Sequence, residues 1–418
     1  MHADAAQRVR VAITGIGPIT AVGTGVEGFW SGLRRQRSPV RRVTRFDASP
    51  WRTQIAAEVD DFDAAVYMDA KVARRMDRFG HFSIAATRLA LEDARLDTSR
   101  LDLDRVGVQM GSALGGAAYA EVQAARLYGG EPRAIDPRVA LTTFPGAASC
   151  SIALEFGFTG PNATNAMSCA AGAIALGDAC RLIRDGSADV AIAGGVEAPL
   201  APLCFGAFAV IRAMSTRNAD PERACRPFDR KRDGFIMGEG ACVLVLERWE
   251  DAVARGARIY AELAGFGTTN DAFHMAAPRP DGTQAARAMR LALGNADMQP
   301  EDIHFISAHG SSTPLNDATE TTAIKSVFGE RAYDVPISGS KPYHAHALGA
   351  SGAIEVALCC LTLQRGWIPP TLNQEDRDDS CDLDYVPNDG RDGRPRAAIS
   401  NSFGFGGINA SLVLRAPQ

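Results

Sequence analysis

The sequence predicts an α/β fold built from two similar halves that are related by a pseudo-twofold axis. Two observations support this prediction. Runs typical of strands alternate with runs typical of helices, which indicates parallel or mixed sheets covered by helices. Four stretches also recur in the same order along the 418 residues. We place the boundary so that the halves are 1–257 and 258–418, and we expect an active site where they meet.

The four recurring stretches justify the predicted elements in turn. The first is a β-rich run that ends in GxG, and the second is a strand that ends near Gly-Ser. The third is a long helix with a Gly- and Ala-rich start and a glycine at its end, and the fourth is a strand that runs into a glycine turn. The pairs are VAITGIGPIT (11–20) with YAELAGFGTTN (260–270), DRVGVQMGSA (104–113) with EDIHFISAHGSS (301–312), 168–186 with 346–366, and 188–195 with 396–407.

The composition limits the possible functions. Hydrophobic residues make up 46% and charged residues 22%, an ordinary globular balance. The net charge of −5 offers no general attraction to nucleic acid or to an anionic membrane, so any basic docking site is local. No apolar run is long enough to span a bilayer, and MHADAAQRVR at the N-terminus has no apolar signal core. The nine cysteines contain no CxxC pair, which favours reduced thiols in the cytoplasm, and Cys359–Cys360 in VALCCLTL is expected in the core.

Cys169 stands among small residues in NAMSCAAGAIALGDA, directly before a run that favours a helix. Two interpretations are open on this stretch alone. A buried cysteine can pack as a small hydrophobic residue. A cysteine at a helix N-terminus can instead be a nucleophile, because the partial positive charge and unpaired N–H groups there lower a thiol pKa and hold an oxyanion.

Two histidines stand where catalytic residues commonly gather. His309 ends an apolar run just before the small polar turn of SAHGSSTPLND, and strand ends carry the chemistry in α/β folds. His346 follows Lys341 by five residues and precedes a helix start that resembles the one behind Cys169. The glycine-rich stretch SNSFGFGGINA (400–410) is not a dinucleotide-binding fingerprint.

Seven motifs, in this order along the chain, resemble those of a known family. They are AGGVEAP (193–199), STRNADPERACRPFDRKRDGFIMGEGA (215–241), DAFHMAAP (271–278), AHGSSTPLND (308–317), SKPYHAHALGASGAIE (340–355), CDLDYVPN (381–388) and SNSFGFGGIN (400–409). The chain resembles the β-ketoacyl-[acyl carrier protein] synthases of the thiolase superfamily, most of all the synthase II type of bacterial fatty-acid synthesis, over nearly its whole length. The resemblance implies a five-layered αβαβα fold and a homodimer that works in fatty-acid elongation.

The resemblance also implies two half-reactions at one thiol. Cys169 takes an acyl group from an acyl carrier protein. Malonyl-carrier protein then loses CO2, and its carbanion attacks the acyl thioester to give a 3-ketoacyl product. His309 and His346 surround the malonyl thioester carbonyl, and Lys341 biases their electrostatics. The N–H groups of Cys169 and Phe405 form the oxyanion hole, and the Phe405 ring, flanked by glycines, gates the acyl pocket. No cofactor and no metal are implied, since the substrates carry phosphopantetheine on the carrier protein.

Further positions match substrate-binding and network residues of the family. Ser311 and Thr313 would bond the phosphopantetheine arm. Glu355, Ser400 and Asn401 match a buried site where some relatives hold an ion, for which an internal hydrogen-bond network is the alternative. The substrate-binding positions are Ser311, Thr313, Phe403, Leu114, Val139 and Asn409, and the network positions are Asp317, Glu320 and Glu355.

The chain departs from the family pattern at several positions. Ala276 replaces a threonine that binds pantetheine in relatives, and Ala345 replaces a glycine. The additional imidazole of His344 is expected to be exposed rather than catalytic. The stretch 136–151 departs most, and in the family this region shapes the acyl pocket across the dimer interface. The preferred acyl chain length therefore stays open.

An acidic carrier protein requires a locally basic docking face. Arg133 and Arg212 match docking positions of the family. Lys71, Arg74 and Arg75 cluster in DAKVARRMDRF, where the argument rests on charge and a solvated helix face is the alternative.

Other functions differ from this one at single positions. A non-catalytic chain-length-factor subunit would lack Cys169, and a thiolase would carry a second cysteine in the loop that reads SNSFGFGG here. A synthase that starts from acyl-CoA would carry asparagine in place of His346. A synthase of polyketide or other specialised metabolism uses the same chemistry, and the sequence does not separate it from fatty-acid elongation.

Overall fold

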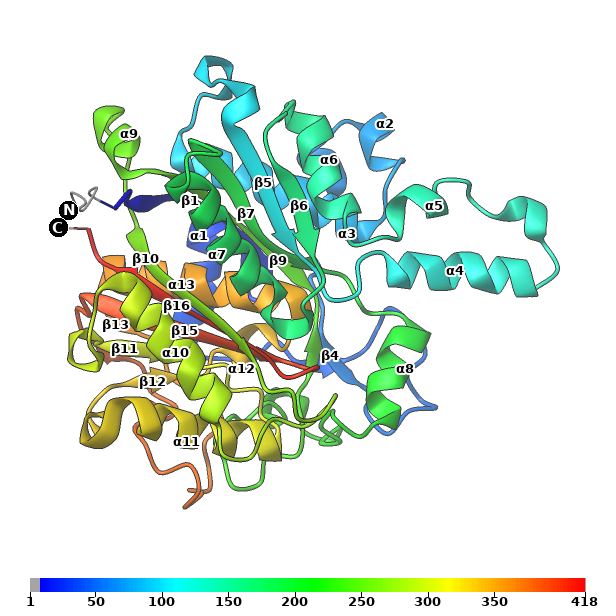
Figure 1. Cartoon of the computed structure of the whole chain (residues 1–418). Helices are drawn as coiled ribbons and strands as arrows, with labels where there is room; N and C mark the ends of the chain where they lie inside the picture. Colours follow the sequence, from blue (N-terminus) through cyan, green and yellow to red (C-terminus); the bar gives the residue numbers. More distant parts are fainter. Residues whose placement is uncertain (1–7, 418) are drawn as a thin grey trace.

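One mixed β-sheet of eleven strands runs through the computed structural model, which describes residues 8–417 (Figure 1). Its strands are β1 (Val11–Thr20), β2 (Gly23–Thr24), β5 (Val106–Gly111), β6 (Asn162–Asn165), β7 (Val190–Glu197), β9 (Gly240–Arg248), β10 (Ala261–Asn270), β11 (Phe305–Ser307), β12 (Ile337–Ser338), β15 (Ala397–Gly404) and β16 (Ile408–Arg415). The strand order is β12-β11-β15-β16-β10-β1-β9-β7-β5-β6, and β2 pairs with β1. Most of the N-terminal stretch predicted to lack a signal core lies outside the described residues.

The sheet has two halves of matching order. Read outward from the centre, the strands are β1-β9-β7-β5-β6 in one half and β10-β16-β15-β11-β12 in the other. The halves join where Ala12–Ile13 of β1 pairs antiparallel with Ala261–Glu262 of β10. The recurring stretches occupy equivalent places, since β1 corresponds to β10, β5 to β11 and β7 to β15. The predicted α/β fold is confirmed, and residue 257, which falls between β9 and β10, stays a predicted boundary.

Helices form three layers around the two half-sheets. The principal helices are α1 (Gly25–Arg34), α3 (Arg78–Ala94), α6 (Ala147–Phe156), α7 (Ala171–Arg184), α10 (Thr283–Ala296), α11 (Pro314–Phe328) and α13 (Ser351–Arg365). α7 and α13 pack against each other between the half-sheets, and each contacts strands of both. α3 and α6 cover the outer face of the N-terminal half, and α10 with α11 beside it covers the outer face of the C-terminal half. The arrangement has the five layers that the family resemblance implied.

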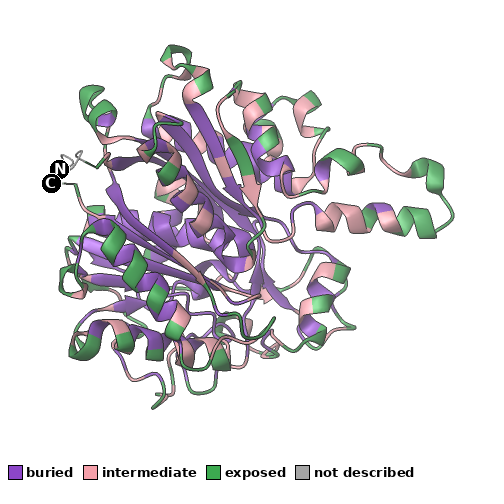
Figure 2. Cartoon of the chain, in the orientation of Figure 1, coloured by how far each residue is buried: buried purple, intermediate pink, exposed green. Residues whose placement is uncertain are grey.

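A helical arm, residues 116–146, projects beyond the sheet (Figure 1). It contains α4 (Ala117–Tyr128) and α5 (Val139–Thr142), and most of its surface is exposed or only partly buried (Figure 2). Glu121 tethers the arm to the body, because its carboxylate accepts the N–H of Leu203 at 2.7 Å at the start of α8 (Pro202–Val210). The remaining helices and strands are α2 (Ala70–Ala73), α9 (Trp249–Ala254), α12 (Lys341–His344), β3 (Arg41–Arg42), β4 (Ile55–Ala57), β8 (Met237–Gly238), β13 (Trp367–Ile368) and β14 (Arg391–Asp392).

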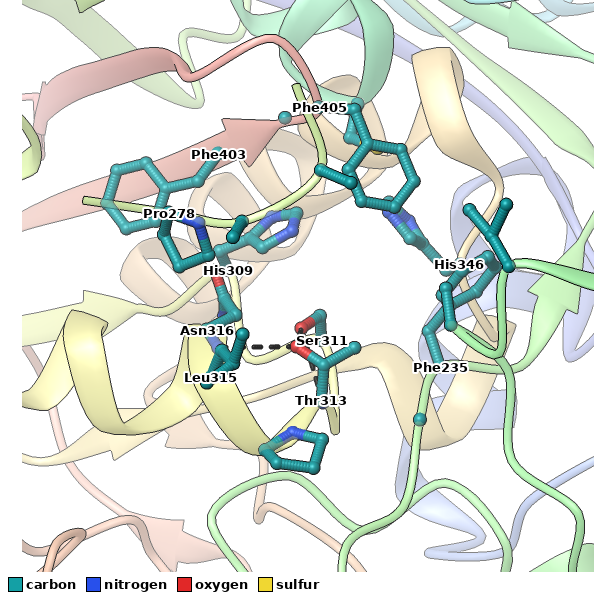
Figure 3. A pocket seen from close by; sticks show the side chains of 18 of the residues that line it. Phe235, Pro278, His309, Ser311, Thr313, Leu315, Asn316, His346, Phe403 and Phe405 are labelled. Atoms are coloured by element: carbon teal, nitrogen blue, oxygen red, sulfur yellow. Dashed lines mark hydrogen bonds between the residues drawn. The ribbon is translucent and has the colours of Figure 1, made fainter. Parts of the chain in front are cut away.

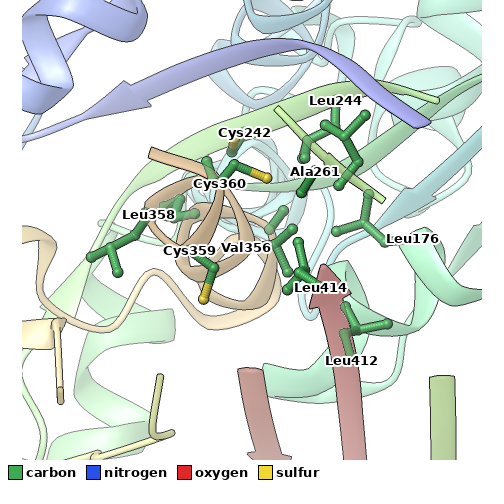
Figure 4. Packing of buried hydrophobic residues seen from close by; sticks show 14 of the residues in the cluster. Leu176, Cys242, Leu244, Ala261, Val356, Leu358, Cys359, Cys360, Leu412 and Leu414 are labelled. Atoms are coloured by element: carbon green, nitrogen blue, oxygen red, sulfur yellow. The ribbon is translucent and has the colours of Figure 1, made fainter. Parts of the chain in front are cut away.

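The core is centred on the middle helix layer. Residues Ser351–Leu363 of α13 are all buried, because the helix is apolar or small on every face and packs between two sheets. Figure 4 shows Leu358, Cys359 and Cys360 of this helix among side chains of the neighbouring strands. The predicted core position of the two cysteines is confirmed, since both are fully buried.

In the part of the chain that the structure describes, no helix is both long enough and apolar enough to cross a membrane. The nine cysteines lie between residues 150 and 381, all within the described range, and none is in a disulfide.

Candidate active site

A cavity of about 380 Å³ opens where the two halves of the chain meet (Figure 3). It lies at the ends of β11 and β15 and at the start of α7. Its lining includes nine of the residues predicted from the sequence: Cys169, Arg212, His309, Ser311, Thr313, His346, Phe403, Phe405 and Asn409. Ala276 lines it as well, so the cavity has no hydroxyl at that position.

Cys169 lies on a short 3-10 helix, η5 (Ser168–Ala170), which leads directly into α7. The cysteine is buried, with 7% of its surface exposed. A Cβ on Gly404 would lie 3.1 Å from the backbone nitrogen of Cys169, so the end of β15 approaches the cysteine closely. Gly404, the last residue of β15, therefore has room beside Cys169 only because it lacks a side chain.

Burial raises the pKa of the Cys169 thiol to about 12, while the nearby Lys341 cation and the N–H of Phe405 act to lower it. The helix N-terminus, which the nucleophile interpretation invoked to lower the thiol pKa, does not decide it here, because the lost hydration of the thiolate outweighs both favourable contacts. Cys169 is therefore a thiol at rest and must lose its proton as it reacts.

The imidazole rings of His309 and His346 face each other across the cavity. Their centroids are 5.3 Å apart and their planes are inclined by 79°. Burial and the Lys341 cation hold the pKa of both imidazoles well below the ordinary value. The Nδ1 atom of His346 lies 2.9 Å from the Ser351 hydroxyl, which leaves Nε2 for a ligand. Two neutral imidazoles thus offer N–H groups that can donate to a carbonyl oxygen.

Lys341 is a fully buried cation next to the histidine pair. Its Nζ lies 2.5 Å from Oε1 of Glu355 and 3.4 Å from Nδ1 of His309, and it also donates to the backbone carbonyl of His309. Burial raises the pKa of Glu355 to about 7, and Lys341 acts in the opposite direction. The Glu355 carboxylate compensates the charge of Lys341. The Lys341 cation in turn disfavours the protonated form of the two histidines.

Two buried carboxylates hold the turn that carries His309. Glu320 accepts the backbone N–H groups of His309 at 2.8 Å and of Gly310 at 2.9 Å. Asp317 accepts the N–H of Phe228 at 2.9 Å and lies 3.4 Å from the hydroxyl of Ser311. This is the geometry of the ordering role predicted for the two acidic residues.

The predicted ion site contains two oxygens that have no partner within residues 8–417. They are Oε2 of Glu355 and Oγ of Ser400. Asn401 is already engaged, since it accepts the Ser411 hydroxyl at 2.8 Å. Within the residues that the structure describes, no cluster of three or more His, Cys, Asp or Glu side chains could hold a metal ion.

The Phe405 side chain belongs to a row of aromatic rings that leads to His346. It stacks on Phe208 of α8, with centroids 6.1 Å apart, and Phe208 meets Phe235 edge-on at 5.8 Å. Phe235 meets the ring of His346 at 5.4 Å. Gly406 has a φ of 84°, a conformation that suits glycine and places a flexible link behind Phe405. Phe208 was not predicted from the sequence, because its partner lies in the other half of the chain.

Two predicted pocket residues lie outside this cavity. Leu114 is half-buried and belongs to an apolar cluster that contains Cys169. Val139 lies on α5 of the arm and does not line the cavity of a single chain. Its predicted role concerned a pocket shared across a dimer interface and stays a prediction.

The predicted docking cations are all exposed or half-buried. Arg212 lies at the cavity, and Arg133 lies on the arm. Lys71 belongs to α2, and Arg74 and Arg75 follow it. Within the described residues, none of these five side chains is in an ion pair, so their charges are available to an acidic partner.

The expectation that His344 is exposed is wrong. The side chain is fully buried, and its Nε2 lies 3.0 Å from the Ser340 hydroxyl. Ala345 adopts φ 54° and ψ −165°, a conformation usually reserved for glycine. The backbone of His346 then pairs with Ile236, its N–H donating to the carbonyl at 2.7 Å. This sharp turn directs consecutive side chains inward.

The comparisons with known proteins agree with this geometry. The chain matches the description "Beta-ketoacyl synthase, N-terminal domain" over residues 8–252 and "Beta-ketoacyl synthase, C-terminal domain" over residues 260–375. It is 44% identical to a 3-oxoacyl-[acyl-carrier-protein] synthase 2 of Synechocystis sp., over 99% of each chain. It is 41% identical to a protein of the same name from Staphylococcus aureus, over 98% of this chain and 99% of that one.

Solved structures are similar over the whole chain as well. The ishigamide ketosynthase/chain length factor is 37% identical with a TM-score of 0.92, over 98% of this chain and 100% of the other. A type II PKS acyl-carrier protein in complex with its ketosynthase is 36% identical with a TM-score of 0.90, over 99% of this chain and 100% of the other. A beta-ketoacyl synthase from Burkholderia phymatum is 35% identical with a TM-score of 0.92, over 98% of this chain and 100% of the other. The predicted family resemblance and thiolase-like fold are confirmed.

We expect the imidazoles of His309 and His346 to remain neutral at pH 6, where a histidine of ordinary pKa is mostly protonated. The pKa is lowered, so the neutral form persists as the pH falls through 6.5. Long-range proton–nitrogen NMR of histidine-labelled protein measures this, with the exposed His274 as an internal reference. In a Lys341→Met, Glu355→Gln double variant the cation is lost, and both pKa values rise. Imidazolium signals from the two buried rings at pH 6 in the parent protein contradict this prediction.

Proposed function

Because the chain belongs to the β-ketoacyl synthase family, we propose that it is a β-ketoacyl-[acyl-carrier-protein] synthase of fatty-acid elongation. The observation that carries this proposal is the meeting of Cys169, His309 and His346 in one cavity. The relatives named 3-oxoacyl-[acyl-carrier-protein] synthase 2 are 41% and 44% identical, which supports fatty-acid elongation. A non-catalytic chain-length factor is not favoured, because the nucleophile and both imidazoles are present.

In the first half-reaction, Cys169 receives the acyl group. Its sulfur forms a bond with the acyl carbon, and the bond from that carbon to the phosphopantetheine sulfur breaks. The leaving sulfur departs as a thiol with the proton that Cys169 gives up. The N–H groups of Cys169 and Phe405 stabilise the oxyanion formed on the way, and Lys341 favours the transient thiolate.

In the second half-reaction, malonyl-carrier protein provides the carbon nucleophile. The bond to its carboxylate breaks, CO2 leaves, and the electron pair moves toward the thioester carbonyl. His309 and His346, whose lowered pKa values favour the neutral form, each donate one N–H hydrogen bond to that oxygen. The carbanion then attacks the acyl carbon on Cys169, a 3-ketoacyl thioester forms, and the cysteine sulfur leaves and regains a proton.

Replacement of the nucleophile tests the first half-reaction. We expect Cys169→Ala to fold normally and to form no covalent acyl adduct with an acyl-carrier protein, as measured by intact mass. His309→Ala and His346→Ala are expected to keep the adduct and to slow CO2 release from malonyl-carrier protein about 100-fold or more. The histidine effects are expected to be non-additive, since the residues act as a unit. An undiminished adduct on the alanine variant of Cys169 overturns the assignment.

We assign Phe405 the role of a gate that covers the acyl cavity. Its ring rests on Phe208 and has glycines on both sides, so that an entering acyl chain can move it aside. The ring thereby couples acylation of Cys169 to the arrival of malonyl-carrier protein.

Removal of the gate is expected to uncouple the two half-reactions. In Phe405→Ala, CO2 release from malonyl-carrier protein no longer requires an acyl primer. Phe273→Ala, at an exposed aromatic residue on a neighbouring loop, is the control and should keep the parental primer dependence. The measurement is CO2 release with and without primer. A primer dependence unchanged in Phe405→Ala removes the gate.

The proposed substrates reach the site on acyl carrier protein, whose acidic surface is complementary to the exposed cations near the cavity. One similar solved structure is a type II PKS acyl-carrier protein in complex with its ketosynthase, which supports this partner. We place the enzyme in the cytoplasm, which is supported by nine cysteines outside disulfides. No nucleic-acid partner follows from a chain of net charge −5.

We also propose that two copies form a homodimer through β6. This strand is the last of the sheet and pairs on one side only within residues 8–417. Such an edge leaves backbone groups that a second strand can use. Large apolar side chains lie exposed around it: Leu154 on α6 is 86% exposed, and Met167 beyond β6 is 44% exposed. A second copy would cover both.

A charged side chain introduced at the β6 edge is expected to separate the two copies of the dimer. Leu154→Lys and Met167→Lys should each shift the protein toward the monomer at micromolar concentration, because a lysine resists burial. Val253→Lys, at a similarly exposed apolar residue on α9, should leave the mass unchanged. Light scattering coupled to gel filtration measures the mass. Dimers of parental stability in both edge variants contradict the assignment of β6.

A further inference from the structure

Glu197 is a buried carboxylate at the end of β7 that the mechanism above does not use. Its exposure is 0%, and it forms no ion pair with any residue from 8 to 417. Four donors surround it instead. Its Oε1 accepts the Ser112 hydroxyl at 3.0 Å and the Leu114 N–H at 3.1 Å, and its Oε2 accepts the Ala113 N–H at 2.6 Å and the Gly349 N–H at 2.9 Å.

These donors come from both halves of the chain. Residues 112–114 follow β5 in the N-terminal half, whereas Gly349 lies in η9 (Leu348–Ala350), three residues after His346. A Cβ on Gly349 would lie 2.5 Å from Ala113 N and 2.8 Å from Oε2 of Glu197. The segment after β5 and the turn after His346 are therefore in direct backbone contact, and the carboxylate bridges them.

The four groups around Glu197 are all hydrogen-bond donors, so both oxygens of the side chain at this position must accept hydrogen bonds. A carboxylate has only acceptor sites, and four of them are filled here. A glutamine of the same shape would present an NH2 group to two of the four donors. Burial raises the pKa of Glu197 to about 7, and the backbone N–H groups act to lower it. An apolar side chain in its place would leave three backbone N–H groups buried without an acceptor, which costs free energy.

Glu197 and its four donors, here called the Glu197 clamp, lie next to the nucleophile. Ala113, Leu114 and Leu348, which flank it, belong to the same apolar cluster as Cys169. Glu197 is also among the charges that act on the Cys169 thiol, and it raises the thiol pKa.

We propose that Glu197 is a positioning residue that fixes the Ser112–Leu114 segment, which packs beside Cys169, against the turn after His346 and sets the electrostatic surroundings of Cys169. The part of the test that uses acyl chain length rests on the proposed function. The part that uses alkylation does not, since it requires only a reactive thiol.

Alkylation of Cys169 tests the charge. Iodoacetamide labelling of the peptide that contains Cys169, followed by mass spectrometry over a pH series, gives the apparent pKa of the thiol. Glu197→Gln removes a negative charge and is expected to lower that apparent pKa by about one unit. Glu197→Asp keeps the charge and should keep the profile. Glu247→Gln is the matched control, since Glu247 is a buried carboxylate that the register places at the opposite end of β9.

Ser112→Ala tests the clamp without a change of charge. It removes one of the four donors, so the Ser112–Leu114 segment loosens. Because Leu114 is a predicted pocket residue, the preference among primers of different length is expected to shift about tenfold. Ser99→Ala, at an exposed serine, should keep the parental preference. An unchanged alkylation profile in Glu197→Gln overturns the proposal. Where that variant does not fold, an unchanged primer preference in Ser112→Ala overturns it. If no variant condenses substrates although the alkylation shift is present, the proposed function fails and the role of Glu197 stands.

Discussion

The close approach of two backbone segments at the centre of the molecule is the constraint on which the active site depends. A Cβ on Gly172 would lie 2.7 Å from the carbonyl oxygen of Gly349, so neither position has room for a side chain. Gly172 follows Cys169 by three residues, and Gly349 follows His346 by three. The pseudo-twofold arrangement thus brings the nucleophile of one half and an imidazole of the other to equivalent places on either side of a single contact.

The electrostatics of the site follow from its burial. Lys341 is buried with Glu355 at 2.5 Å, and its charge reaches the thiol and the imidazoles in a medium of low polarity. Burial and the same cation lower the pKa of His309 and His346, and the cation also acts to lower the pKa of Cys169. The Lys341 cation, paired with Glu355, therefore acts on Cys169 in the first half-reaction and on the two neutral histidines in the second.

The sequence predicted most of the fold, because periodicity and packing agree in the long elements. The apolar run around Cys359 became a helix buried on every face, and the paired repeats became equivalent strands and helices. What it could not predict depends on neighbours distant in the chain. Phe208 and Phe405 are 197 residues apart, and only the fold reveals that their rings stack. His344 is polar by type, yet the unusual turn at Ala345 directs it into the core.

The difference between local patterns and distant contacts also explains which site residues could be predicted from the sequence. Cys169 was identified by the order of the family motifs, since its local pattern left packing and nucleophile both open, and its pKa depends on burial, which no local pattern shows. Glu197 stands inside a recognised motif, but its importance lies in contacts with residues 112–114 and 349 that the sequence does not place together.

The arm at 116–146 shows how such an enzyme can change during evolution. It joins the body at its two ends and through Glu121, outside the glycine contact that aligns the catalytic groups. Insertions, deletions and substitutions in the arm can therefore accumulate without disturbing the thiol or the imidazoles. A lineage can therefore vary this one appendage while it inherits the catalytic centre intact.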